Sequence, residues 1–409
     1  MSGITAPRGT FDILPEQAGP RAALEAAARE LLEAAGYARI ETPAFEATEL
    51  FARGVGESTD IVQKEMYSFD DGGGRSLTLR PEGTAPVCRA YLQHGMHKLP
   101  QPVRLYYLSS FFRAERPQQG RYREFWQVGV EAIGSEDPAL DAEVIVLLAA
   151  LLRRVGVRGT RLRIGSLASP GTRAAYRDEL AAYLHAHAER LAANVRERID
   201  LNPLRAFDSD DPDTRAVMAG APRLLDRLDA SDAEHFATVR DLLDRAGLAY
   251  EVDPRLVRGI DYYTRTVFEF TSDALGAQSG VGGGGRYDGL IEVLGGPPTP
   301  GIGWAAGVER ILLAAGEPAP SVRPVDLFVA YEERRGDAFA TVVEARAAGL
   351  AAEMELAGRT LKGQLKHADR LGARYVAIVE PGAVRLRDRG AGTEESLERD
   401  AVVARVSAS

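Results

Sequence analysis

The feature that most constrains the fold is a helical block that separates two strand-rich stretches of the chain. Residues 172–247 are rich in Ala, Leu, Arg and Asp, and LAAYLHAHAERLAANVRERI has apolar positions at helical spacing. Residues 1–170 and 250–316 instead hold the glycine-rich, aromatic and strand-like segments. We therefore expect one strand-rich domain whose two parts flank a helical insertion.

A small α/β domain is predicted at the end of the chain. GEPAPSVRP, residues 316–324, contains three prolines, which is typical of a linker. Strand-like DLFVAY and RYVAIVE enclose two segments predicted as helices, AFATVVEARAAGLAAEMELA and TLKGQLKHADRLG. The sequence thus predicts an α+β chain with a strand-rich domain in two parts (1–171 and 250–318), a helical insertion (172–249) and a C-terminal α/β domain (325–409).

Composition and charge exclude several classes of protein. The single cysteine, Cys88, excludes an internal disulfide and a multi-cysteine zinc site. The six histidines are scattered without acidic partners at ligand spacing, so we expect no metal bound by protein side chains. No apolar run approaches the roughly 20 residues that span a bilayer, and the N-terminus lacks a signal-peptide layout. We expect a cytoplasmic protein that does not contact a membrane.

A predicted hairpin carries the most informative chemistry. RLYYLSSFFRAERPQQGRYREFWQVGVEAIG alternates as a strand, turns through an arginine-rich loop and returns as a second strand. Arg113 ends the first strand, and Gln127, Gly129 and Glu131 share one face of the second. We expect Gly129 to leave room for a ligand between an amide and a carboxylate. The arginines of the loop suit phosphate groups, although an ordinary hairpin with an Arg–Glu pair remains possible.

Two further segments bring polar groups to strand ends. In LTLRPEGTAP, Glu82 and Thr84 have the same parity around Gly83, an arrangement that suits an ammonium group, although the segment taken alone favours an ordinary turn. In LVRGIDYYTRTVFEF, Arg258 precedes a glycine turn, and two tyrosines, Tyr262 and Tyr263, stand at the entry of a β-branched and aromatic strand.

Glycines mark two other stretches. SGVGGGGRYDGL contains G-x-G-x-x-G, the dinucleotide-binding fingerprint, but no strand–helix alternation surrounds it. A Rossmann oxidoreductase is therefore a weak alternative. GIGWAAGVERILLAAG is predicted as one helix, with Gly303, Gly307 and Arg310 on a single face and Arg310 projecting at its far end.

Taken in order, these segments resemble a class II aminoacyl-tRNA synthetase, and most specifically the histidyl-tRNA synthetase family. GYARIETPAFEATELFARGVGESTD with IVQKEMYSF resembles the first class motif, FFRAERPQQGRYREFWQVGVEAIG the second and GIGWAAGVERILL the third. LVRGIDYYTRTVFEF and GVGGGGRYDGL resemble the stretches that distinguish the histidine enzymes. The resemblance implies an antiparallel catalytic sheet flanked by helices, an anticodon-binding C-terminal domain and a homodimer.

The resemblance implies a role for each matching residue. The substrates would be L-histidine, ATP with Mg²⁺, and tRNA(His). Arg113 and Arg258 would flank the α-phosphate of ATP, and Arg310 would stack on the adenine. Histidine would be bound by Glu82, Gly83, Thr84, Gln127, Glu131, Tyr262, Tyr263 and Tyr287, and ATP by Arg113, Glu115, Arg123, Arg258 and Arg310.

The same resemblance implies two contacts with tRNA. Arg116 and Gln118 in the arginine-rich loop would reach the acceptor end. Lys362, Lys366 and Arg370 recur every four residues of a predicted helix and would face the anticodon region, although a solvated helix face explains them equally well.

One member of the wider family is a real alternative. The non-catalytic paralogue that regulates ATP phosphoribosyltransferase has the same fold, but it usually lacks the C-terminal domain and several active-site residues, which are present here. Trp126 departs from the polar residue that the family often has at this position, but strand alternation directs it away from Gln127, so we expect little effect.

Overall fold

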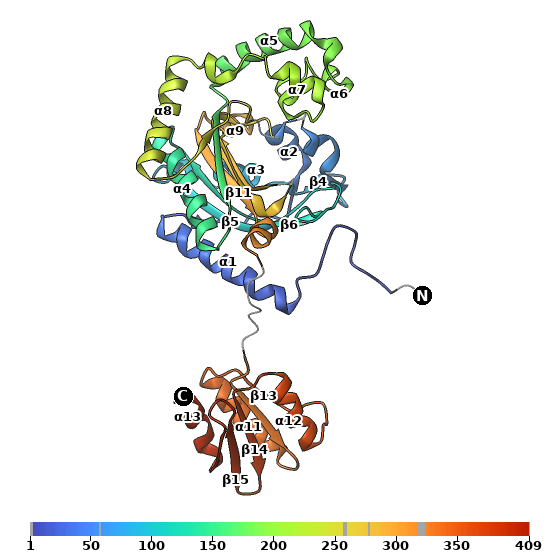
Figure 1. The fold of residues 1–409 in the computed structure, drawn as a ribbon, viewed down its shortest axis with the longest axis vertical. Helices are drawn as coiled ribbons and strands as arrows, with labels where there is room; N and C mark the ends of the chain where they lie inside the picture. The colour runs from blue at the N-terminus through green and yellow to red at the C-terminus, as the bar shows by residue number, and fades with distance from the viewer. Residues whose placement is uncertain (1–2, 57–58, 257–259, 277–278, 317–323, 409) are drawn as a thin grey trace. The chain divides into compact units, whose positions relative to one another are not determined.

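The computed structural model describes residues 3–56, 59–256, 260–276, 279–316 and 324–408. The chain divides into two compact units, Met1–Ala319 and Pro320–Ser409 (Figure 1). Most of the predicted linker lies outside the described residues. Within the described ranges, no helix has both the length and the apolar character that crossing a membrane requires.

A mixed, mainly antiparallel sheet forms the centre of the first unit. Its strands run in the order β1-β5-β6-β11-β10-β9-β7-β8, and only the outer pairs β1–β5 and β7–β8 are parallel. The two parts of the strand-rich domain meet where β6 pairs with β11. The bounds are β1 Ala38–Arg39, β5 Val103–Phe112, β6 Glu124–Ile133, β7 Thr160–Ser166, β8 Glu251–Val252, β9 Thr264–Ser272, β10 Gly280–Arg286 and β11 Gly301–Gly307.

Strand alternation gives the two faces of this sheet different partners. Val128, Val130 and Ala132 on β6 join the main core with helices α1, α4, α8 and α10. Residues of the other parity face α3 and α9, which pack over the opposite side with Leu105 and Tyr107 of β5. The helix bounds are α1 Pro15–Ala34, α3 Thr84–Gln93, α4 Pro138–Arg154, α8 Ala230–Arg245, α9 Leu290–Val293 and α10 Val308–Ala315.

The prediction of one helix through GIGWAAGVERILLAAG is wrong. Gly301–Gly307 is strand β11, paired with both β6 and β10, and the helix begins only at Val308. The glycines are needed by the sheet: a Cβ added at Gly303 would lie 2.0 Å from Oε2 of Glu131, and one at Gly301 would lie 2.3 Å from the Tyr287 ring. Arg310 consequently lies in the first turn of α10 and not at its far end.

A small three-stranded sheet and a short helix form a further part of the first unit. Strands β2 (Phe45–Ala47), β4 (Ser76–Leu79) and β3 (Tyr67–Asp70) pair in this order. Helix α2 (Thr48–Val55) follows β2, and a π-helical turn, Ile61–Glu65, leads into β3. The Arg-Pro-Glu-Gly-Thr segment connects β4 to α3. Its Arg80 is hydrogen-bonded to Ser110 and Phe112 of β5, so the segment lies beside the central sheet.

The segment between β7 and β8 is helical in the structure. Helices α5 (Pro170–Ala186), α6 (Ala193–Arg196) and α7 (Pro212–Met218) gather at one end of the first unit, whereas α8 lies beside α4 (Figure 1). The apolar residues of α5, α6 and α7 form a second core with Tyr263 and Val267. These helices therefore pack against β9 and against the segment just before it, which contains Tyr262 and Tyr263.

The second unit has a five-stranded sheet in the order β13-β12-β14-β15-β16. The prediction that AEMELA continues a helix is wrong, because Ala352–Met354 is strand β13, which pairs in parallel with β12. The other bounds are β12 Leu327–Tyr331, α11 Arg335–Ala347, α12 Leu361–Arg370, β14 Tyr375–Glu380, β15 Ala383–Asp388, β16 Thr393–Leu397 and α13 Val402–Ser407.

Candidate active site

Two connected cavities open on the face of the central sheet. The outer cavity, of about 520 Å³, is lined by the arginine-rich loop, β10, β11 and the start of α10. The inner cavity, of about 340 Å³, is lined by Glu82, Gly83, Thr84, Tyr107, Tyr262 and Tyr263 with the π-helical turn. The two cavities form one continuous site, because they share five lining residues: Arg113, Arg121, Gln127, Gly283 and Ala305.

Arg113 lies at the junction of the two cavities. It directly follows β5, and its Nε donates to the carbonyl oxygen of Pro81 at 2.9 Å. Its guanidinium lies 5.2 Å from the centre of the Phe125 ring. One bond to a carbonyl and one stacked ring fix the side chain, and the remaining N–H groups are available to an anion that spans both cavities.

Glu82 is fixed at the beginning of α3. Its carboxylate accepts the backbone N–H groups of Thr84 at 2.7 Å and Ala85 at 2.9 Å. Burial nevertheless raises the pKa of Glu82, with these backbone hydrogen bonds opposing the rise. The Tyr262 hydroxyl also donates to it at 3.4 Å. A ligand cation in the inner cavity would stabilise the charged form.

Glu131 is the most deeply buried acid of the site. Its side chain is 0% exposed, and its Oε1 accepts the Thr84 hydroxyl at 2.8 Å. Among the described residues its Oε2 has no hydrogen-bond partner. It does not itself line the inner cavity, but Thr84 does. Burial raises the pKa of Glu131 to about 8, and the Thr84 hydroxyl only partly opposes this.

The raised pKa predicts a specific dependence of stability on pH. Between pH 4.5 and about 8 the folded state keeps a proton on Glu131 that the unfolded chain releases, so stability should fall as pH rises through this window. The Glu131→Gln variant should lose this component. We expect the melting temperatures of wild type and variant to converge as pH rises from 5 to 8.5, or to cross in favour of the variant. A constant difference between the two proteins at all pH values would contradict the assignment.

Tyr107 occupies the space that the sequence assigned to a ligand. A Cβ added at Gly129 would lie 2.3 Å from its Cζ, and one at Gly83 would lie 2.5 Å from the same atom. The room above Gly129 is therefore filled by protein, and that prediction is wrong. The Tyr107 hydroxyl is buried without a partner among the described residues, although the residue lines the inner cavity. The two facing glycines were the signal that could have revealed it.

The three tyrosines predicted to bind histidine lie together but not at equal depth. The rings of Tyr262 and Tyr263 are 4.7 Å apart, and both residues line the inner cavity. Tyr287 is only 1% exposed and is not among the lining residues. Its ring lies 5.9 Å from that of Tyr262, so it supports the cavity wall from behind.

Arg310 closes one side of the outer cavity. Its Nε donates to the carbonyl of Gly280 at 2.5 Å, and its Nη1 donates to that of Gly120 at 3.5 Å. The side chain thereby connects β10 with the arginine-rich loop. Burial lowers the pKa of Arg310. The planar guanidinium remains part of the cavity wall, as stacking on a nucleobase requires.

The arginine-rich loop differs in detail from the prediction. Arg121, which the sequence did not single out, lines both cavities and pairs with Glu115 at 2.9 Å. Arg123 is not among the residues that line either cavity, because its guanidinium donates to the carbonyls of Glu115 and Arg8 at 3.3 Å. Arg116 and Gln118 are exposed at the loop's tip.

A buried ion pair that sequence reasoning missed supports this cavity. The Glu309 carboxylate accepts one hydrogen bond from the guanidinium of Arg21 on α1 at 3.0 Å and one from the backbone N–H of Trp126 at 3.0 Å. The Arg21 guanidinium lies 4.6 Å from the centre of the Trp126 ring. Trp126 therefore points away from the cavity that Gln127 lines, as alternation predicts, and it has a packing role on the helical side of the sheet.

The glycine run in SGVGGGGRYDGL is strand β10 and not a turn before a helix. It pairs antiparallel with both β9 and β11, which excludes the dinucleotide-binding arrangement. Gly283 lines both cavities. Gly284 and Gly285 are required by neighbouring protein instead, since an added Cβ would lie 1.9 Å from the Gly303 carbonyl and 2.6 Å from that of Thr266.

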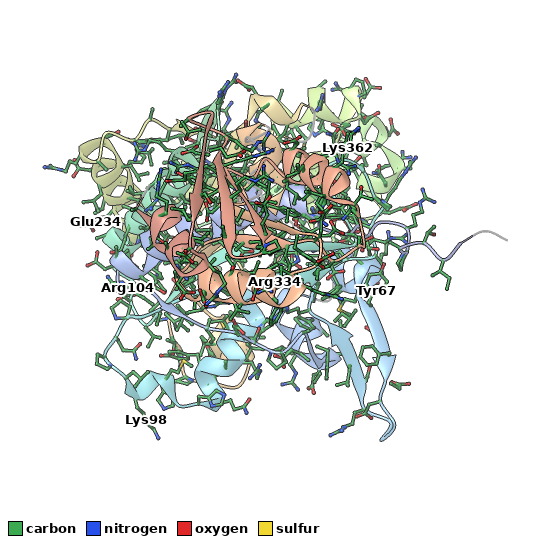
Figure 2. All side chains as sticks on the ribbon, turned by 90° about the horizontal axis from the view of Figure 1, so that it is seen from below. Tyr67, Lys98, Arg104, Glu234, Arg334 and Lys362 are labelled. Carbon is green, nitrogen blue, oxygen red and sulfur yellow. The ribbon has the colours of Figure 1, made fainter. Side chains whose placement is uncertain are left out.

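Four predicted site residues belong to the second unit or fall outside the described residues. Arg258 falls outside the described residues. Lys362, Lys366 and Arg370 are exposed on α12 of the second unit, where Figure 2 labels Lys362.

Comparison with known proteins identifies the family. The protein-family model described as Histidyl-tRNA synthetase matches residues 9–311. Histidine--tRNA ligase of Desulforudis audaxviator is 49% identical over 412 residues, covering 98% of each chain. The crystal structure of apo S. aureus histidyl-tRNA synthetase is similar with a TM-score of 0.83 and 36% identity, covering 99% of this chain and 100% of that one.

A more distant structure bears on the regulatory alternative. A Bacillus halodurans protein described as an ATP phosphoribosyltransferase regulatory subunit/histidyl-tRNA synthetase has a TM-score of 0.64 and 27% identity, covering 87% of this chain and 94% of that one. The match to the ligase of D. audaxviator is far closer in sequence and extends over the C-terminal unit. The chain belongs to the histidyl-tRNA synthetase family.

Proposed function

We propose that this chain activates L-histidine with ATP to form histidyl-adenylate and pyrophosphate, and then transfers histidine to the 3′ end of tRNA(His). The observation that carries the proposal is the position of Arg113 at the junction of two cavities. One cavity has the acids and hydroxyls that suit histidine, and the other has the arginines and glycines that suit a nucleotide. The α-phosphate must lie where the two substrates meet.

The inner cavity supports recognition of histidine by paired polar groups. Glu82, Thr84 and Gln127 would bind the α-amino group, and Gln127 Oε1 is a buried acceptor without a partner among the described residues. Glu131 and Tyr263 would bind the imidazole. An apolar analogue would leave these groups unpaired, which is a strong basis for discrimination.

The outer cavity supports binding of ATP. Arg310 would stack on the adenine, and Arg113 would contact the α-phosphate, with Arg258 opposite. Mg²⁺ would enter as part of the MgATP substrate, bound mainly by phosphate oxygens. Glu115 and Glu269 supply carboxylate oxygens on the wall of this cavity, the ligand type that Mg²⁺ prefers.

The reaction needs charge neutralisation more than proton transfer. The carboxylate of histidine is already ionised and attacks the α-phosphorus, pyrophosphate leaves, and no general base is required. Two anions must approach each other, so guanidinium groups held in place before the reaction contribute most. The hydrogen bond from Arg113 to Pro81 and the stacking on Phe125 supply such fixation.

We assign functions to the parts of the chain accordingly. Residues 1–171 and 250–318 would form the catalytic domain, 172–249 the insertion and 325–409 the anticodon-binding domain. A homodimer in the cytoplasm is expected. Phe45 and Phe69 of the small sheet are 50% and 44% exposed with rings 6.3 Å apart, which suits burial against a second copy.

The basic stripe on α12 gives a test of the anticodon contact. Replacing Lys362 and Lys366 with glutamine should raise the KM for tRNA(His) and reduce the salt dependence of tRNA binding by about two counterions, because two phosphate contacts are lost. Pyrophosphate exchange without tRNA should not change. The matched control replaces Arg334 and Arg335 of the same unit, and equal effects of both pairs on tRNA binding would contradict the assignment.

Aminoacylation tests the complete function. Purified protein supplied with ATP, Mg²⁺, labelled L-histidine and tRNA(His) should accumulate acid-precipitable histidyl-tRNA. A well-folded protein that binds ATP phosphoribosyltransferase but charges no tRNA would overturn the proposal in favour of the regulatory paralogue.

A further inference from the structure

A third cavity lies behind the histidine site, between the helical insertion and the catalytic sheet. This rear cavity has a volume of about 410 Å³, within the range of sites for small molecules. The end of α2, the start of α5, the segment around Leu201 and the turn after β10 enclose it. None of the proposed contacts with histidine, ATP or tRNA uses it, apart from the shared wall residue Tyr262.

Three arginines give this cavity a positive lining. Arg173 on α5 donates to the carbonyl of Tyr263 at 2.6 Å and to that of Asp261 at 3.4 Å. Arg177, one helical turn later, donates to the carbonyl of Leu201 at 3.0 Å. Among the described residues neither guanidinium has a carboxylate within ion-pair distance. Arg53 lines the cavity from α2 and is ion-paired with Glu49, which is not a lining residue.

Two acids, Asp261 and Asp288, also line the cavity. Asp288 pairs with the buried Arg286 at 3.2 Å and accepts the Gly301 N–H at 3.1 Å. Asp261 accepts the Asn202 amide at 3.4 Å. Burial lowers the pKa of Arg173, and the negative charge of the nearby Asp261 only partly opposes this shift. An anion in the cavity would add to this partial compensation beside Arg173 and Arg177.

The rest of the lining is apolar. Its side chains come from α2, the insertion and the turn after β10, and they are Val55, Leu201, Leu204, Leu290 and Val293. Guanidinium forks bind phosphate oxygens through paired hydrogen bonds, and apolar walls favour a ligand with a hydrocarbon portion.

We propose that the rear cavity binds a small phosphate monoester whose organic portion is apolar. Its phosphate would contact Arg53, Arg173 and Arg177, and its organic portion would pack on the leucine side chains. Tyr262 forms part of both the rear and the inner cavity, and its hydroxyl donates to Glu82. A bound ligand would thereby alter the histidine site through the shared tyrosine wall.

Direct binding of two probes tests the site. Phenyl phosphate and inorganic phosphate are titrated against the full chain at constant ionic strength and followed by phosphorus NMR. Phenyl phosphate should bind more tightly than inorganic phosphate. The variant with Arg53→Gln and Arg177→Gln should lose at least about tenfold in phenyl phosphate affinity, because charge-assisted contacts are removed. The matched control, Arg75→Gln with Arg245→Gln, removes two exposed arginines elsewhere in the unit and should bind as wild type does.

A second variant separates this site from the junction of the other two cavities. Phenyl phosphate binding should persist in Arg113→Gln, since that residue is not part of the rear cavity. Loss of binding in Arg113→Gln, equal affinity of the two probes, or unchanged affinity in the Arg53/Arg177 variant would each overturn the proposal. The coupling rests on the proposed function: an unchanged dissociation constant for histidine with phenyl phosphate bound would contradict the coupling alone.

Discussion

Replacement of Arg113 with glutamine should lower kcat for histidine-dependent pyrophosphate exchange by about a thousandfold, or about 4 kcal/mol of transition-state stabilisation. Arg113 lies at the junction of the two cavities, where its guanidinium is hydrogen-bonded to Pro81 and stacked on Phe125. Its charge is therefore held where the two anions meet. Glutamine preserves a hydrogen-bond donor but removes the charge. The KM for histidine should change little, because the polar groups of the inner cavity remain.

The neighbouring Arg116 provides the matched control for this variant. It is exposed in the same loop, so Arg116→Gln removes an equal charge without altering the junction. Its exchange rate should remain near that of wild type, whereas its charging of tRNA should decrease. Near-normal exchange by Arg113→Gln, or an equal loss in Arg116→Gln, would show that the position of the charge is not what matters.

The second large effect is expected for Glu131→Ala, which should raise the KM for histidine by about a hundredfold or more. The substitution removes the acceptor of the Thr84 hydroxyl and leaves that buried hydroxyl without its partner. It also removes the partnerless Oε2, the atom we assign to the imidazole. The KM for ATP should change far less, because Thr84, the hydrogen-bond partner of Glu131, lines the inner cavity and not the outer one.

Glu136→Ala is the control for this experiment, since it removes an exposed acid a few residues along the same chain segment. It should leave the KM for histidine unchanged. Glu131→Gln, which retains an oxygen for the Thr84 hydroxyl, should lie between wild type and Glu131→Ala. A Glu131→Ala variant that remains folded and binds histidine normally would remove this residue from the imidazole site.

The alternation of side chains between the two faces of a strand was sufficient to predict the hairpin of β5 and β6 and the orientation of Gln127 and Trp126. Two ten-residue strands with opposite faces leave little freedom of interpretation. Strand alternation did not reveal what fills the space over Gly129. The residue that fills it, Tyr107, comes from the neighbouring strand, and its ring also contacts Gly83, which belongs to a third segment. That contact depends on three chain segments at once.

The errors in secondary structure have a common cause. Gly301–Gly307 is rich in glycine and alanine, and Ala352–Met354 has residues that favour helices, so local preference opposed both strands. Pairing with neighbouring strands decided the outcome in each case. The same limit applies to Arg121 and Arg123. Both lie in one loop, and the bonds of Arg123 with the carbonyls of Glu115 and of Arg8 in the N-terminal segment direct it away from the cavities.

The most direct test of the account is exchange of labelled pyrophosphate into ATP by the purified wild-type chain. Exchange should be rapid, should require both Mg²⁺ and L-histidine, and should not require tRNA. Histidinol, which lacks the attacking carboxylate, should not support exchange. Folded protein that shows no histidine-dependent exchange would contradict the central claim that the two cavities joined at Arg113 activate histidine.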